Sequence, residues 1–89
     1  MIQHPVTIIN QLGLHARASA KLVSLALRYQ SECFLVMDQK RVNAKSIMAV
    51  MTLGAKQHTP LILDIEGPDE TAMCEALSSL IENRFGEQS

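Results

Sequence analysis

The order of strand-like and helix-like stretches along this short chain most constrains its fold. β-Branched or alternating apolar residues mark four candidate strands, at positions 6–9, 32–37, around 41–42 and 61–66. Apolar side chains on one helical face mark three candidate helices, at positions 16–30, 47–53 and from about 69 to 85. This order predicts an α+β domain whose helices pack on one face of a sheet.

Length and composition restrict the domain further. The 89 residues suit a single core, and a domain of this size buries only about 60–65% of the surface of its extended chain. Hydrophobic residues make up 47% of the chain but aromatic residues only 3%, so we expect an aliphatic core in one domain, residues 1–89. A net charge of −1 and the shortage of aromatic rings argue against nucleic-acid binding.

Neither a membrane segment nor a metal site is expected. No stretch approaches the roughly 18 uninterrupted apolar residues of a membrane-spanning helix, and the first residues lack the pattern of a secretion signal. We therefore expect a cytoplasmic protein that does not insert into membranes. Cys33 and Cys74 are far apart among apolar neighbours and no metal-ligand spacing is present, so we expect two buried thiols.

A histidine lies between the first strand and the first helix. His15 follows a turn at residues 10–13, and Arg17 begins a basic helix face that continues with Lys21 and Arg28. An imidazole is largely neutral near pH 7, and the N–H groups of a helix start have no intrahelical partner, so this is a place to hold a phosphoryl group. On spacing alone, a simple helix cap at His15 and a solvated Arg17 fit the pattern as well.

The short helix expected at 47–53 is unusually apolar. Ser46 is a suitable N-cap and Gly54 a suitable stop. One buried stripe accounts for three of the residues between them, Ile47, Val50 and Met51. Met48 and Leu53 carry apolar surface to other sides, so we expect an exposed apolar patch that binds partner proteins.

Two stretches resemble one family. Residues 13–20, with His15 and Arg17, resemble the phosphohistidine motif of HPr, the histidine phosphocarrier family of the bacterial phosphoenolpyruvate-dependent phosphotransferase system. Residues 45–51, with Ser46, resemble the regulatory-serine region of that family, at the separation that the family has. The similarity runs through essentially the whole chain.

The resemblance implies an open-faced β-sandwich, with a four-stranded antiparallel sheet, three helices on one face and the order β-α-β-β-α-β-α. It implies that His15 accepts a phosphoryl group on Nδ1 from phosphorylated enzyme I and passes it to IIA proteins. Arg17 and the backbone of Ala16 and Arg17 would contact the phosphate. The chain would then be a monomeric carrier rather than a turnover enzyme, and it would need no cofactor and no metal.

The resemblance also implies a regulatory site and a partner surface. Ser46 would be phosphorylated by a regulatory kinase, and about −1.5 to −2 added charges would repel acidic partners without unfolding the domain. Partners would dock on a basic and apolar surface made of Lys21, Arg28, Ile47, Met48 and Met51.

Two alternatives stay open at this point. The first is the nitrogen-related paralogue NPr, which serves regulatory IIA proteins only. The second is a small acyl or phosphoryl hydrolase, which is disfavoured because we expect no Asp, Glu or Asn side chain beside His15 to activate a water. One position departs from the family pattern, since Ala18 stands where many members have proline. We expect a slightly looser helix start there and intact chemistry.

Overall fold

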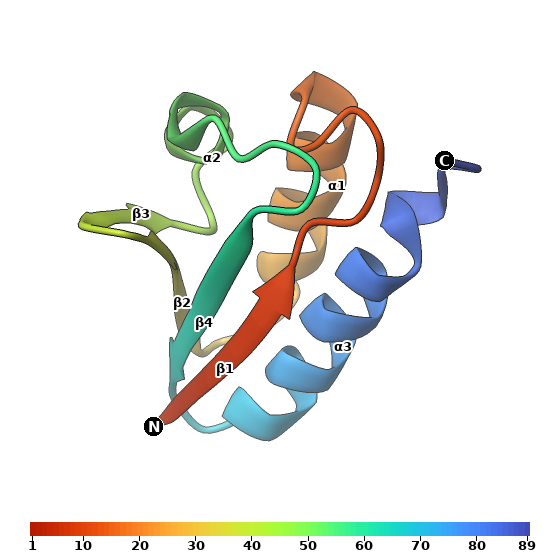
Figure 1. Ribbon diagram of the computed structural model, residues 1–89. Helices are drawn as coiled ribbons and strands as arrows, with labels where there is room; N and C mark the ends of the chain where they lie inside the picture. Colours follow the sequence, from red (N-terminus) through yellow and green to blue (C-terminus); the bar gives the residue numbers. More distant parts are fainter.

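The computed structural model describes residues 1–89 and contains the elements in the predicted order (Figure 1). The elements are β1 (Ile2–Thr7), α1 (Ala16–Ala26), β2 (Glu32–Met37), β3 (Lys40–Asn43), α2 (Ile47–Leu53), β4 (Pro60–Glu66) and α3 (Glu70–Glu82), with a final 3₁₀ turn (Arg84–Gly86). None of the helices has the length and hydropathy needed to cross a membrane.

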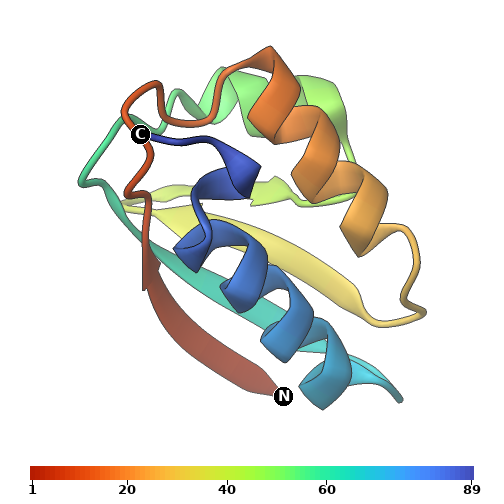
Figure 2. The same ribbon diagram turned by 90° about the vertical axis from the view of Figure 1, so that its right-hand side faces the viewer.

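The four strands form one sheet in the order β1-β4-β2-β3, and every neighbouring pair is antiparallel. The helices lie on one side of this sheet, and α1 and α3 run side by side across it (Figure 2). The register places Leu35 of β2 opposite Leu63 of β4, and both side chains are fully buried beneath the helices. The predicted α+β open-faced sandwich is therefore confirmed.

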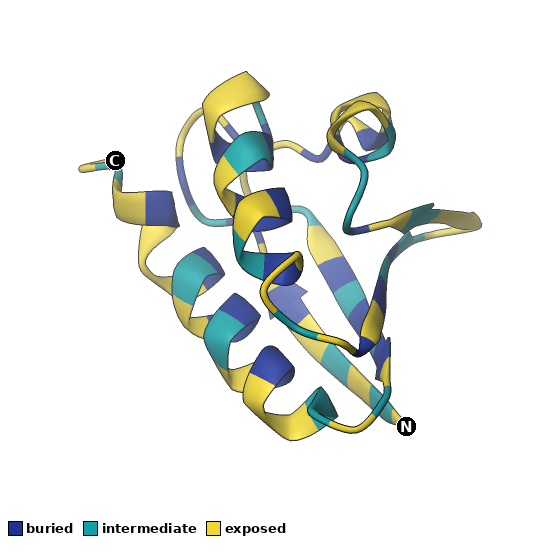
Figure 3. Cartoon of the chain, turned by 180° about the vertical axis from the view of Figure 1, so that it is seen from behind, coloured by how far each residue is buried: buried dark blue, intermediate teal, exposed yellow.

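The core is aliphatic, as the composition predicted. Alternate residues of the strands face the helices, and the buried residues of α1 and α3 lie on the sides of these helices that face the sheet (Figure 3). Phe85 is the one aromatic residue buried in this core. Cys33 and Cys74 are both buried free thiols, as predicted, and burial, with a smaller effect of nearby Asp64, raises the pKa of Cys33 to about 12.

The bounds of β1 and the end of α1 differ most from the prediction. The first strand occupies Ile2–Thr7 instead of residues 6–9, because pairing with β4, and not the β-branched run, sets its register. Pro5 is tolerated inside this strand because β1 is an edge strand that pairs only with β4. The first helix ends at Ala26 and not near residue 30, since residues 30 and 31 are held in a turn by a contact from the residue that precedes α3.

That contact comes from Asp69, which occupies the N-cap position of α3. Its side chain makes no capping bond to α3. Instead, the carboxylate accepts hydrogen bonds of 2.9 Å from the backbone N–H groups of Gln30 and Ser31, and a further bond from the Ser31 hydroxyl. The hydrogen bond from the Ser31 hydroxyl has the largest effect on the pKa of Asp69, and the bond from the Gln30 N–H has the next largest. Together they hold this pKa below its usual range. Asp69 thus ties the turn before β2 to the start of α3.

We expect Asp69→Asn to destabilise the fold in a pH-dependent way. Because folding lowers the pKa of Asp69, the ionised carboxylate stabilises the native state above its ordinary pKa of about 3.9, and this contribution disappears as pH falls through the folded value. Urea unfolding should therefore show a clear loss of free energy of unfolding at pH 7 and almost no difference from wild type near pH 2. An equal loss at both values would contradict the ionic role.

Candidate functional site

A tightly packed loop presents His15 at the start of α1. Gly13 has a φ of +67°, and a Cβ there would come within 2.5 Å of the Ala55 carbonyl oxygen. The next residue, Leu14, is buried and donates its backbone N–H to the same oxygen at 2.9 Å. His15 then occupies the N-cap position with extended backbone, and its carbonyl oxygen accepts the N–H of Ser19 at 2.8 Å. The loop therefore fixes the backbone from which the imidazole projects.

The imidazole of His15 does not cap the helix. Its side chain is 28% exposed and makes no capping hydrogen bond. Nε2 lies 2.5 Å from Oε2 of Glu87, whereas Nδ1 has no hydrogen-bond partner. The alternative of a simple capping histidine is therefore wrong, and one ring nitrogen is left free.

The expectation that no acidic or amide side chain lies beside His15 is also wrong. Asn10 is fully buried, and its Nδ2 donates to the Gly13 carbonyl oxygen at 2.8 Å and to Oε1 of Glu87 at 3.1 Å. Partial burial raises the pKa of Glu87, but the hydrogen bonds from His15 and Asn10 and the charge of Lys21 outweigh it, so this pKa lies below its ordinary value. Glu87 is thus held as a carboxylate.

Glu87 reaches His15 because the segment after α3 folds back over the helix start (Figure 2). Arg84 and Phe85 both have a φ of 55°, which turns the chain, and the Phe85 ring is buried in the core. The Lys21 ammonium donates to the Phe85 carbonyl oxygen at 2.7 Å, and the Gln11 N–H donates to the main-chain oxygen of Ser89 at 3.0 Å. The sequence pattern extended the last helix to about residue 85, whereas α3 ends at Glu82, and only the apolar Phe85 in front of a glycine signalled that the chain end would pack.

The first turn of α1 offers free donors next to the ring. The backbone N–H groups of Ala16, Arg17 and Ala18 have no acceptor in the structure, as the geometry of a helix start requires. The Arg17 side chain is exposed and makes no ion pair or hydrogen bond. Ala16 and Arg17 lie at an open hollow, which is lined by Gln11, Leu12, His15, Ala16, Arg17, Glu87 and Ser89.

The short helix α2 has the predicted caps and a different buried side. The Ser46 hydroxyl accepts the Ala49 N–H at 3.3 Å, and Gly54 ends the helix with left-handed backbone, so both capping predictions are confirmed. The buried side consists of Val50 and Leu53, which are three residues apart. Ile47, Met48 and Met51 are exposed by 43%, 72% and 41%, so the predicted buried stripe is wrong for Ile47 and Met51. An exposed apolar patch is nevertheless present, with Met48 at its most exposed point.

The basic residues predicted on the first helix face the solvent. Arg17, Lys21 and Arg28 line a shallow hollow with Leu25 of the same stretch and Leu80 of α3. Lys21 also holds the Phe85 carbonyl oxygen, so part of its role is to fix the chain end near His15. Arg28 lies two residues beyond the end of α1.

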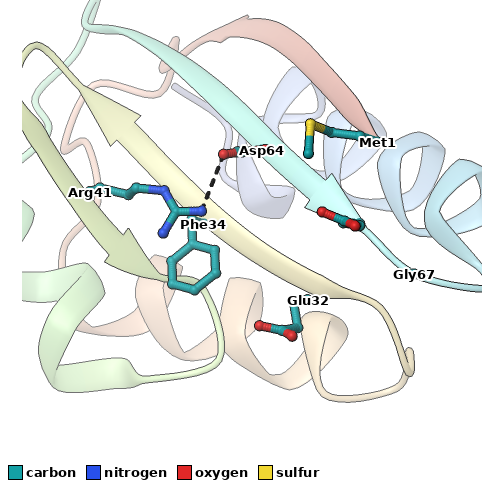
Figure 4. A pocket seen from close by; sticks show the side chains of 7 residues that line it. Met1, Glu32, Phe34, Arg41, Asp64 and Gly67 are labelled. Carbon is teal, nitrogen blue, oxygen red and sulfur yellow. Dashed lines mark hydrogen bonds and ion pairs between the residues drawn. The ribbon is translucent and has the colours of Figure 1, made fainter.

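A further hollow lies on the sheet (Figure 4). The Arg41 guanidinium stacks 3.7 Å from the centre of the Phe34 ring and contacts Asp64 at 3.3 Å. The hollow contains none of the predicted site residues. No three His, Cys, Asp or Glu side chains of the chain are grouped so as to hold a metal ion.

The fold and the site define a small open-faced sandwich with a histidine at the start of its first helix. Residues 2–83 match the family model described as the PTS HPr component phosphorylation site. Phosphocarrier protein HPr of Xylella fastidiosa is 49% identical over the full length of both chains, and HPr of Cupriavidus necator is 51% identical over 98% of each. The chain belongs to the HPr family of phosphocarrier proteins.

Solved structures agree with this membership. The crystal structure of HPr-C-His from Thermoanaerobacter tengcongensis is 43% identical, covers all of both chains and superimposes with a TM-score of 0.96. Phosphocarrier protein NPr of Shewanella violacea is also a relative, at 34% identity over 99% of this chain and 97% of its own. A dimeric HPr structure from T. tengcongensis is 45% identical, covers 92% of this chain and 94% of its own, and has a TM-score of 0.79. The monomeric state of the present chain stays a prediction.

Proposed function

We propose that this chain accepts a phosphoryl group from phosphorylated enzyme I on Nδ1 of His15 and passes it to IIA proteins. The observation that carries the proposal is the arrangement of the imidazole. Nε2 is occupied by Glu87, while Nδ1 is unpartnered, and His15 directly precedes the free N–H groups of the first turn of α1. Family membership supplies the reaction and the classes of partner.

Positioning and charge stabilisation supply most of the catalysis in phosphoryl transfer, so the site needs few groups. The helix start favours a bound phosphate by roughly 0.3–1 kcal/mol at an exposed position. Arg17 carries no competing ion pair, and a charge-assisted bond from its guanidinium adds about 1.5–3 kcal/mol. These modest terms favour the phosphorylated form without trapping it, which suits a carrier.

The partner surface of the proposal combines the exposed patch of Ile47, Met48 and Met51 with the basic residues Lys21 and Arg28. The start of α1 lies at the same end of the molecule as α2, next to the loop that carries His15 (Figure 1). A partner that covers this end would therefore exclude water from the transferring phosphoryl group and contact both parts of the surface.

The assay that tests the proposal is incubation with phosphoenolpyruvate and enzyme I. We expect one acid-labile phosphate per chain and no steady release of inorganic phosphate. Steady release without a phosphoprotein would support the hydrolase, because Glu87 supplies a carboxylate beside His15 that could activate a water.

Transfer to a sugar-type and a nitrogen-type IIA protein then separates the HPr role from the NPr role. The higher identity to the HPr relatives favours the former.

We expect Ser46→Asp to slow phosphate acceptance by about fivefold at low ionic strength, with a smaller effect at high salt. Aspartate is itself a good N-cap, so α2 should keep its start while the partner surface gains a negative charge. We also propose that a regulatory kinase phosphorylates Ser46. Ser46→Asp imitates the negative charge of that modification. Ser79→Asp, at an exposed position on α3, is the matched control. Equal rates for Ser46→Asp and wild type would remove the electrostatic argument.

A further inference from the structure

Glu87 is bound from two sides by groups of different kinds. Oε1 accepts a hydrogen bond from the amide of buried Asn10 at 3.1 Å, and Oε2 lies 2.5 Å from Nε2 of His15. An ionised carboxylate can only accept hydrogen bonds, so Nε2 must carry the proton of this contact. In a neutral imidazole the other nitrogen is then unprotonated, and its lone pair is available. The contact therefore selects the tautomer in which Nδ1 is the nucleophile.

We propose that Glu87 is a positioning residue for phosphoryl transfer, which holds the Nε2–H tautomer of His15 and offsets the positive charge that the ring gains when Nδ1 bonds to phosphorus. This inference rests on the proposed function, because it concerns the same ring. The pKa of Glu87, held below its ordinary value, agrees with a partner that is ionised at neutral pH.

The proposed step balances without an additional acid or base. The Nδ1 lone pair forms the bond to phosphorus, and the bond from phosphorus to the donor breaks with its electron pair returning to the donor. His15 keeps its Nε2 proton, so the ring becomes a phosphorylated imidazolium next to the Glu87 carboxylate. In onward transfer the bond between phosphorus and Nδ1 breaks, its electron pair returns to Nδ1, and the neutral Nε2–H ring is restored.

Repulsion between the Glu87 carboxylate and the phosphoryl oxygens is weaker than its attraction to the imidazolium ring. The carboxylate contacts the Nε2 edge of the ring, whereas phosphorus binds at Nδ1, so the imidazolium charge lies closer to the carboxylate than the phosphoryl oxygens do. Arg17 is free to pair with those oxygens. The buried Phe85 and the Lys21 bond to its carbonyl oxygen keep Glu87 in place, so the carboxylate is part of a packed segment.

Two substitutions of Glu87 test whether its carboxylate positions the His15 imidazole or only attaches the chain end. In Glu87→Gln, the Asn10 amide is a donor and should select the glutamine oxygen, which turns the glutamine NH₂ towards His15. That NH₂ donates to Nε2 and selects the opposite tautomer, with the proton on Nδ1. The size and both hydrogen bonds are preserved, but the nucleophile is lost, as happens when an amide replaces the carboxylate of a catalytic triad. Glu87→Ala removes the bond without imposing a wrong tautomer.

We expect Glu87→Gln to accept phosphate from enzyme I at least about tenfold more slowly than wild type, and more slowly than Glu87→Ala. Nitrogen NMR of the unphosphorylated full chain should show an unprotonated Nδ1 for His15 in wild type and a protonated Nδ1 in Glu87→Gln. Glu75→Gln, an exposed position on α3, is the control for loss of charge, and circular dichroism checks the fold of each variant.

The opposite ranking would overturn the inference. If Glu87 only attaches the chain end, Glu87→Gln should behave as wild type in rate and tautomer, and Glu87→Ala should be the slower variant. If wild type itself gains no phosphate, the proposed function fails, and the role of Glu87 in transfer fails with it. The reversed ranking of the two variants would contradict only the role of Glu87, because wild type would then still be phosphorylated.

Discussion

His15→Gln should take up no phosphate from phosphoenolpyruvate and enzyme I, whereas wild type should take up one acid-labile phosphate. Glutamine has no nucleophilic nitrogen, because its amide lone pair is delocalised, but its NH₂ can still donate to Glu87. The backbone bond from Ser19 to the His15 carbonyl oxygen does not depend on the side chain, so α1 should begin at the same residue. The variant therefore removes the acceptor and leaves the fold.

The control for this variant is His58→Asn, which removes another histidine. His58 has a φ of 73°, a conformation that asparagine tolerates better than most residues, so its replacement should be structurally mild. We expect wild-type phosphate uptake by His58→Asn and unchanged thermal unfolding of both variants. Acid-labile phosphate on His15→Gln would place the acceptor at another residue and would contradict the proposed function.

The order of elements was predictable because it depends on local patterns. The strand period of residues 32–37 and the capped helix from Ser46 to Gly54 are visible in a few neighbouring residues, and the structure has both. Boundaries that depend on distant contacts were not predictable. The start of β1 is set by pairing with β4, and the end of α1 depends on Asp69, far along the chain.

The candidate site also contains some residues that a local pattern predicts and others that depend on distant contacts. His15, Arg17 and the free N–H groups of the helix start follow from one short stretch, so the sequence predicted them together. Glu87 is 72 residues from His15 and lies in a segment with no regular period, so no local pattern pairs the two. The buried Asn10 that orients Glu87 looked like an ordinary turn residue. The group that selects the reactive nitrogen thus became visible only in the folded chain.

Arg17→Ala should slow phosphate acceptance by about 10- to 150-fold. This range corresponds to the loss of one charge-assisted bond of about 1.5–3 kcal/mol to the transferring phosphoryl group. The Arg17 side chain is exposed and makes no ion pair or hydrogen bond, so its removal should leave thermal unfolding unchanged. A slower reaction with unchanged stability would therefore report on the reaction and not on the fold.

Two further variants identify what Arg17 contributes. Arg17→Lys keeps the charge but not the planar fork of donors, so an intermediate rate would indicate that the guanidinium contacts phosphoryl oxygens with more than one N–H. Lys40→Ala removes one positive charge from an exposed position on β3 and should leave the rate unchanged. If Lys40→Ala slows acceptance as much as Arg17→Ala, the effect of Arg17 comes from long-range attraction of partners. If Arg17→Ala alone is slow, and remains slow at high salt, the guanidinium acts on the phosphoryl group at short range, where salt screens least.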